Sequence, residues 1–299
     1  MPSVMTFKCR LYGIDQSSIE RKFVEIANSS SYDYILNLGG SVFSGTATST
    51  NMGNQKYVST YHTFDSLGVP HFFLLIIDIH LKSIQLNLTL HEQRDSGSFW
   101  QVAATNNNEI IGIRESFHAG STLEVARINQ TNGFMETIGT YPYGSYSIVM
   151  VYAPKRRLYY NVIESTLYAV NIDTGELDIN IQIPNDYTIY GIDYDFVNDR
   201  LIALIYSSSI TNGWILTQII ITTKKETKFD RIGKTIIPFE KYSWTTTYTI
   251  NSNERFWMTL WSSKDSKKSI FIVLNIDNGE IMEKWETNKT DLSNLVCFD

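Results

Sequence analysis

Four histidines are the residues of this chain best suited to hold a metal ion. A neutral imidazole beside a carboxylate is a typical zinc donor set, and acidic residues follow one of the four closely. No histidine belongs to a tight ligand pattern such as His-x-His or His-Glu-x-x-His, and loop histidines are more often solvated. A metal site is therefore the weaker hypothesis, and we expect no cofactor. The candidate ligands are His62, His71, His91 and His118.

Aromatic residues with polar tips form the second group with possible chemistry. Such rings bind sugar faces or peptide side chains at a low entropic cost. Each single ring has an alternative role, which is packing between neighbouring structural units. We predict that as a group they bind a ligand. The candidates are Tyr32, Trp100, Tyr143, Tyr187, Tyr190 and Trp244.

Motifs for nucleophilic or nucleotide chemistry are absent from the sequence. It has no Gly-x-Ser-x-Gly elbow, no phosphate-binding Walker loop and no Gly-x-Gly-x-x-Gly before a helix. No catalytic residue is therefore predicted, and a binding role is favoured over an enzymatic one.

The elements that must position these side chains form a repeat. An alternating apolar strand, a polar turn and a second strand recur six times, and an isoleucine precedes each turn. A period of roughly 40–50 residues with several strands per copy is typical of a propeller blade. The isoleucines are Ile14, Ile79, Ile128, Ile172, Ile221 and Ile276.

The repeat predicts an all-β fold, a single six-bladed β-propeller over residues 1–299 with four-stranded blades. The hairpin beginning at Leu11 is interpreted as the third and fourth strands of an incomplete N-terminal blade. Leu295–Phe298 should enter that blade as its inner strand, which closes the ring and removes an open sheet edge. Ser31-Tyr32 should open the inner strand of blade two, and residues 41–55 read as an insertion in that blade.

Two hairpins carry the clearest turn chemistry. They contain Asp173-Thr174-Gly175 and Asp277-Asn278-Gly279. We expect each Asp to bond its own backbone and each Gly to take the positive φ that closes the hairpin.

The same two hairpins, LYAVNIDTGELD and IFIVLNIDNGEIMEKW, resemble the PQQ-quinoprotein-like and YVTN-type propeller repeats. The resemblance concerns repeat shape and implies the propeller fold. It does not imply the quinone, because the sequence has no quinone-binding cysteine pair and no calcium-ligand cluster. Propeller lactonases and strictosidine-synthase-like proteins place Glu, Asn and Asp on inner strands. Residues in comparable places here are Asp33, Asn37, Asp193 and Asp299.

Composition and charge argue against nucleic acid and membrane as partners. The net charge of -6 argues against a nucleic-acid surface, and no apolar stretch approaches the ~18 residues of a membrane span. Without a leader-like N-terminus we expect a cytoplasmic protein, with Cys9 and Cys297 reduced and Cys297 buried. The four glycosylation sequons would then stay unmodified. They begin at Asn28, Asn87, Asn129 and Asn288.

The preferred function is a non-enzymatic interaction scaffold for a protein or peptide. In a propeller, the connections between blades and those between second and third strands share one face. The aromatic candidates and four histidines map to that face, where loops usually meet ligands. The alternatives are a metal-dependent lactonase and a carbohydrate-binding lectin.

Overall fold

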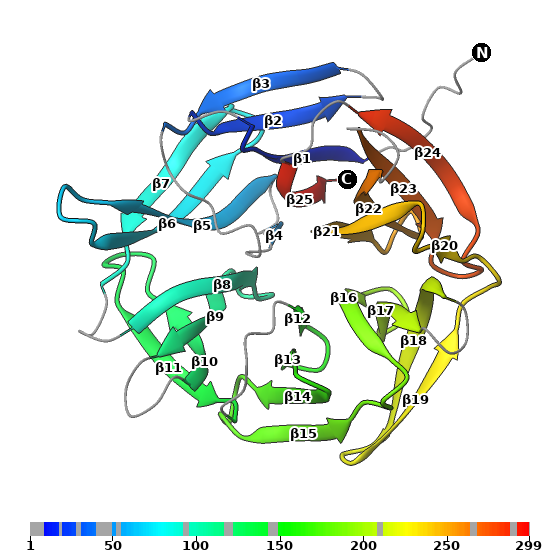
Figure 1. Cartoon of the computed structure of the whole chain (residues 1–299). Helices are drawn as coiled ribbons and strands as arrows, with labels where there is room; N and C mark the ends of the chain where they lie inside the picture. Colours follow the sequence, from blue (N-terminus) through cyan, green and yellow to red (C-terminus); the bar gives the residue numbers. More distant parts are fainter. Residues whose placement is uncertain are drawn as a thin grey trace.

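The computed structural model describes residues 9–17, 20–27, 31–39, 50–51, 55–91, 96–116, 122–142, 149–207, 212–263, 268–287 and 292–298. These residues form strands and turns and contain no helix, so none of them builds a helix that could cross a membrane. Six antiparallel sheets stand around a common axis as a six-bladed propeller (Figure 1). The fold predicted from the repeat is confirmed.

Blades three to six follow the predicted order, from the inner strand outward along the chain. In blade five a short extra strand, β20 (Ile237–Pro238), pairs with the third strand, β18 (Gly213–Thr223). Blade three is β8 (Ser96–Ala104), β9 (Ile110–Ser116), β10 (Thr122–Ile128) and β11 (Met135–Thr140). Blade four is β12 (Val149–Ala153), β13 (Leu158–Ile163), β14 (Thr166–Asn171) and β15 (Leu177–Gln182). Blade five is β16 (Thr188–Asp195), β17 (Arg200–Ser207), β18 (Gly213–Thr223) and β19 (Glu226–Arg231). Blade six is β21 (Tyr242–Asn251), β22 (Phe256–Ser263), β23 (Ser269–Asn275) and β24 (Ile281–Thr287).

The C-terminal strand closes the ring, as the orphan strand at the end of the sequence predicted. It is β25 (Leu292–Phe298), the inner strand of blade one, and it pairs antiparallel with β1 (Arg10–Asp15). Arg10 lies opposite Phe298 and Asp15 opposite Leu292. The rest of blade one is β2 (Lys22–Ala27) and β3 (Ser31–Asn37).

The strand assignment within blade one was wrong by one position. The hairpin beginning at Leu11 is β1–β2, the second and third strands of the blade, and β3 is its outermost strand. Ser31-Tyr32 therefore opens an outer strand and not the inner strand of blade two. Alternation of apolar residues marks a buried strand but not its order in the blade, so the hairpin matched the wrong part of the repeat.

Blade two consists of β4 (Thr50–Asn51), β5 (Lys56–Phe64), β6 (Pro70–Asp78) and β7 (Ser83–Thr89). Its inner strand β4 lies within the stretch interpreted as an insertion, residues 41–55. That stretch therefore contributes to the blade itself; its remaining residues other than Gln55 lie outside the described part of the chain. The sequence did not reveal this strand because two paired residues in a polar stretch do not show the alternating apolar pattern of a buried strand.

Buried side chains gather between blades. Six apolar clusters are present among the described residues, and each joins two neighbouring blades. The cluster between blades four and five, for example, packs Tyr160 and Leu167 against Ile192 and Leu201. Each blade is thus buried by its two neighbours, so the ring holds a continuous core.

In blades four and six the turns between third and fourth strands are closed by asparagine and not by the expected aspartate. The Asn171 side-chain oxygen accepts the backbone N–H groups of Asp173 and Thr174, at 2.9 and 3.2 Å. Asn275 does the same in blade six. The Asp173 carboxylate instead pairs with Arg157. Asp and Asn both favour such turns, and here the Asn two residues earlier makes the bonds that were predicted for Asp.

The glycines of these turns confirm the expected positive φ and also join blades. Figure 1 shows the outer strands running along the rim toward the next blade. The end of each such strand approaches a glycine in the following blade at three boundaries. A Cβ on Gly133 would collide with the carbonyl oxygen of Thr89, and one on Gly175 with that of Ile138. Gly279 meets the carbonyl of Ile232 in the same way.

We expect Gly175→Ala to destabilise the protein by roughly 3 kcal/mol or more, because it adds a backbone clash to the strain of a positive φ. Gly68→Ala is the matched control. Gly68 has a φ of 78°, and a Cβ there meets nothing within 4 Å, so its cost should be about 1 kcal/mol. Urea denaturation of both variants measures the difference, and equal losses would contradict the role of the glycine in the blade boundary.

The two cysteines form a disulfide, so the prediction that both are reduced was wrong. Cys9 and Cys297 have Cα atoms 5.7 Å apart although 288 positions separate them in sequence. The prediction took their redox state from an inferred compartment. Closing the ring pairs β25 with β1, and that pairing brings the two sulfur atoms together. Cys297 is also only partly buried.

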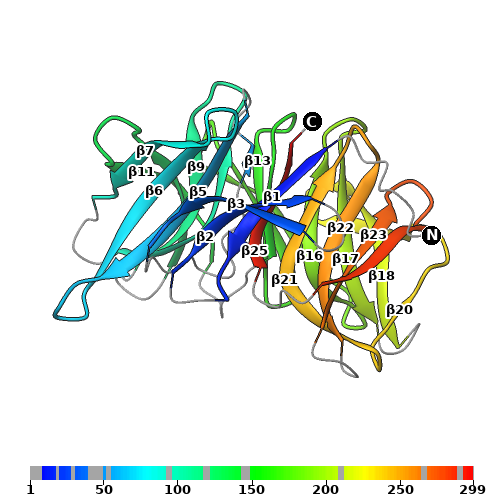
Figure 2. The same ribbon diagram turned by 90° about the horizontal axis from the view of Figure 1, so that it is seen from above.

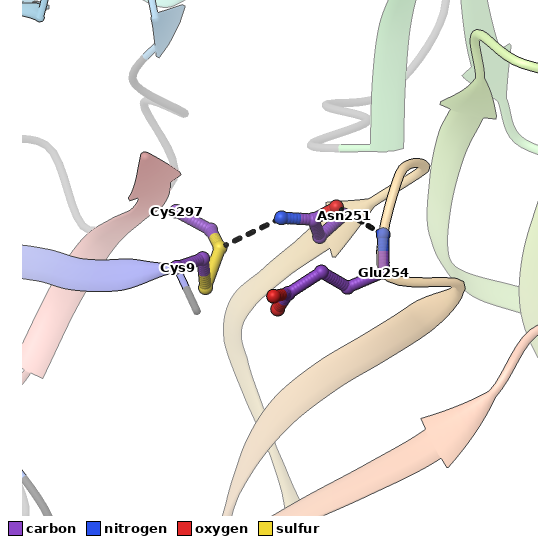
Figure 3. The surroundings of a disulfide bond; sticks show 4 residues. All are labelled: Cys9, Asn251, Glu254 and Cys297. Atoms are coloured by element: carbon purple, nitrogen blue, oxygen red, sulfur yellow. Dashed lines mark hydrogen bonds between the residues drawn. A yellow bond between two sulfur atoms is a disulfide. The ribbon is translucent and has the colours of Figure 1, made fainter. Parts of the chain in front are cut away.

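Asn251 supports this disulfide from blade six (Figure 3). Its side-chain amide donates to Cys297 Sγ at 3.3 Å, and its carbonyl oxygen accepts the Glu254 backbone N–H at 2.8 Å. The disulfide joins β1 to β25 within blade one, and the Asn251 hydrogen bond connects it to the end of β21, the inner strand of blade six.

Candidate functional site

The ring has two faces, and each gathers a different kind of connection. The loop face holds the connections between blades and those between second and third strands. The turn face holds the remaining turns and the Cys9–Cys297 disulfide. Figure 2 shows the ring edge-on, with the end of β25 on the turn face and the tip of the β5–β6 hairpin on the opposite side.

Three of the predicted aromatic side chains are described, and all three are half-buried at blade boundaries. Tyr187 packs on the core between blades four and five, with its ring 5.3 Å from that of Phe229. Tyr190 packs between blades five and six, 6.0 Å from the ring of Trp214. Tyr32 lies on β3, and its hydroxyl bonds Thr287 of blade six.

The structure does not bring the predicted aromatic set together at one mouth among its described side chains. Tyr32 is not in an inter-blade connection, because β3 is an outer strand. Trp100 and Trp244 lie within inner strands β8 and β21 and not in the connections before them; their side chains lie outside the described part, as does Tyr143 altogether.

The histidines do not converge on a metal site within the described residues. His71 lies opposite Thr63 in the β5–β6 ladder, so it points to the other face of the sheet from His62. The His62 ring packs near Phe64 and Phe72, and burial lowers its pKa. The His91 ring packs at a tilt against Phe134 of blade three. His118 is outside the described part, within which no group of three metal-type ligands occurs.

An apolar hairpin tip is the feature of the loop face that the sequence reading missed. The β5–β6 hairpin extends beyond its partner strand β7, since the β6–β7 pairing reaches only Phe73. Its turn projects from the ring (Figures 1 and 2). At the tip, Leu67 is 86% exposed, Phe64 57% and Val69 48%. The sequence signal for this tip is the group of apolar residues, Phe64, Leu67 and Val69, around the turn between two strands.

Asp65 fixes the conformation of this tip. Its carboxylate oxygen Oδ1 accepts the backbone N–H groups of Leu67 and Val69, at 2.8 and 2.9 Å. The other oxygen lies 3.4 Å from His71 Nε2. The hydrogen bond from Val69 is the main reason that the pKa of Asp65 is lowered. The tip is thus preorganised, which reduces the entropy lost when a partner binds.

Asp193 is a carboxyl whose pKa lies far above its ordinary value. It lies on the inner strand β16 and accepts the Tyr194 backbone N–H at 2.8 Å. Burial raises the pKa of Asp193 to about 7, against the lowering effect of hydrogen bonds from the Tyr194 and Ile250 backbone. Asp193 is only partly buried, so it keeps some contact with solvent although protein surrounds it. Such a carboxyl is a candidate proton donor or acceptor.

We expect Asp193→Asn to stabilise the protein, and to do so more at pH 8.5 than at pH 5. The pKa of Asp193 is raised from 3.8 to about 7 on folding, so the folded state holds its proton more tightly. Stability therefore falls as pH rises from 3.8 to about 7, and the loss is complete above that pH. The ionised carboxyl costs up to about 4 kcal/mol. Urea denaturation at both pH values tests this, with the exposed Asp33→Asn as control. A pH-independent effect would contradict it.

A partly buried ion-pair network joins blades five and six on the turn face. The fully buried Asp195 carboxylate contacts Arg200 at 2.7 Å and Arg255 at 2.8 Å. Both arginines also bind Asp277. Burial alone would raise the pKa of Asp195, but hydrogen bonds from Arg255 and Arg200 outweigh it and hold that pKa at about 2. Every charge is paired, so the network fastens the two blades and leaves no reactive group.

Comparison with known proteins identifies the fold and no family. No family model and no curated protein matches the sequence. TolB from Acinetobacter baumannii is similar over 98% of this chain and 67% of its own, with a TM-score of 0.60 and 8% identity. A periplasmic gluconolactonase from Pseudomonas aeruginosa is similar over 97% and 99%, with a TM-score of 0.56 and 8% identity. A putative 6-phosphogluconolactonase from Bacteroides fragilis is similar over the full length of both chains, with a TM-score of 0.55 and 11% identity.

Proposed function

We propose that this propeller is a non-enzymatic binding module that engages a protein partner through its loop face. The observation that carries the proposal is the β5–β6 tip, where Phe64, Leu67 and Val69 stand exposed on a turn fixed by Asp65. Exposed apolar side chains gathered on one part of a surface mark a site of interaction with another protein. A protein groove would bury Leu67 fully, and a small ligand would leave most of the tip in water.

The test compares two exposed leucines of blade two. Leu67 lies on the loop face, and Leu81, 65% exposed, lies in the turn between β6 and β7 on the turn face. We expect Leu67→Ser to weaken partner capture from native cells by about tenfold, the loss for one buried leucine at an interface. Leu81→Ser should bind as the parent does. Equal capture by both variants would place the interface elsewhere.

Asp193 supports a second candidate, hydrolysis of a sugar lactone. Its raised pKa gives the inner strand a group able to exchange protons near neutrality, and two similar structures carry lactonase names. Incubation with gluconolactone and related lactones decides this. Hydrolysis above the buffer rate that Asp193→Asn abolishes would favour the enzyme, and no hydrolysis would favour the binding module.

A further inference from the structure

The turn between β10 and β11 in blade three combines three features that no part of the binding proposal uses. It begins at Asn129, which opens the sequon Asn129-Gln130-Thr131. It lies on the turn face, away from the β5–β6 tip. It also borders a shallow hollow of about 270 Å³, lined by Arg127, Asn129, Phe134, Met135 and Glu136.

The local geometry presents the Asn129 side chain for modification. Its carbonyl oxygen accepts the backbone N–H groups of Thr131 and Asn132, at 2.9 and 3.4 Å. Those two hydrogen bonds use the oxygen of the amide and not its nitrogen. Asn129 and Thr131 are both exposed. A substituent on the nitrogen would keep the bonds that close the turn.

The hollow suits the first sugar of an N-linked glycan. Phe134 is 61% exposed and forms one side of it, with the His91 ring 5.2 Å away. An exposed aromatic face is a platform for the apolar face of a sugar ring. The hollow is smaller than the pockets that enclose drug-sized ligands, which matches one sugar residue.

The disulfide supplies the remaining condition. A Cys9–Cys297 bridge persists in an oxidising compartment such as the secretory pathway, where sequons are glycosylated. We propose that the chain matures in such a compartment and that Asn129 carries an N-linked N-acetylglucosamine, which covers Phe134.

The reaction balances with a donor supplied by that pathway, an oligosaccharide linked to a polyprenyl diphosphate. The Asn129 side-chain nitrogen forms a bond to C1 of the first N-acetylglucosamine. The bond between C1 and the diphosphate oxygen breaks, the polyprenyl diphosphate leaves with the electron pair, and the amide nitrogen loses one proton. No oxidation state changes.

Peptide mass spectrometry of the protein from its own cells, digested without reductant, tests the proposal. We expect a cross-linked Cys9–Cys297 peptide and a glycan on most copies of the Asn129 peptide. An Asn129 peptide without sugar would overturn the proposal, and so would free thiols at both cysteines.

Variants secreted from a eukaryotic host separate the site from its surroundings. Thr131→Ser should retain the glycan and Thr131→Ala should lose it. The matched control is the Asn171 turn, which makes the same backbone bonds but has Asp173 where the sequon needs Thr. Asp173→Thr should therefore add a glycan at Asn171. A glycan at Asn171 in that variant with none at Asn129 would overturn the proposal.

A thermal measurement tests the contact with Phe134. Enzymatic removal of the glycan should lower the melting temperature of the parent protein by a few degrees and leave Phe134→Ala unchanged. An equal change in both proteins would show that the sugar does not cover the ring.

Discussion

Removal of Leu292–Asp299 should abolish cooperative folding. The deletion takes away the inner strand of blade one and exposes the whole edge of β1. It also removes the buried side chains Leu292, Leu295, Val296 and Phe298. At roughly 2 kcal/mol each, their loss of about 8 kcal/mol is comparable to the total stability of an ordinary domain.

Circular dichroism during heating measures the outcome, with a chain lacking Asp299 alone as the control. A synthetic peptide of residues 292–299 added to the truncated chain should restore a cooperative transition and form a disulfide with Cys9. A sharp transition near the parent temperature without the peptide would contradict the closure argument.

Replacement of both cysteines by serine should lower stability by about 5 kcal/mol. The Cys9–Cys297 bridge spans 288 positions, and in the chain-entropy model a loop of that length constrains the unfolded state more than a short loop does. Guanidinium denaturation of the double serine variant, beside the parent with and without reductant, measures the loss.

The Asn251→Ala variant separates the bridge from its supporting hydrogen bond. It removes the amide that donates to Cys297 Sγ but leaves the disulfide intact, so it should cost about 1–2 kcal/mol. A loss equal to that of the double serine variant would show that packing around Asn251, and not the covalent bond, provides the stability.

The sequence predicted most of the fold because buried strands carry a pattern of period two. In blade four, for example, the marked Ile172 directly follows the third strand, β14. Where that pattern was missing, the prediction failed. Strand β4 is two residues in a polar stretch, and the hairpin at Leu11 resembles the outer hairpins of other blades although it lies one strand further in.

The candidate site was harder to predict because it depends on which blade boundary each ring enters. Tyr187 and Tyr190 precede or begin an inner strand, as expected, yet both pack against neighbouring blades. The hairpin tip at Leu67 depends on β5 and β6 outgrowing β7, and strand lengths are poorly marked in sequence. The disulfide required knowing that the ring closes with both cysteines at the same end.

The position of the Cys9–Cys297 bridge also sets how the molecule can be held. Both chain ends described in the structure meet on the turn face, and the β5–β6 tip projects from the loop face (Figure 2). A surface or fusion partner attached near Cys9 or Cys297 would hold the ring by its turn face. The Leu67 tip would then point outward, so the bridge gives a tethered copy of the propeller a defined orientation.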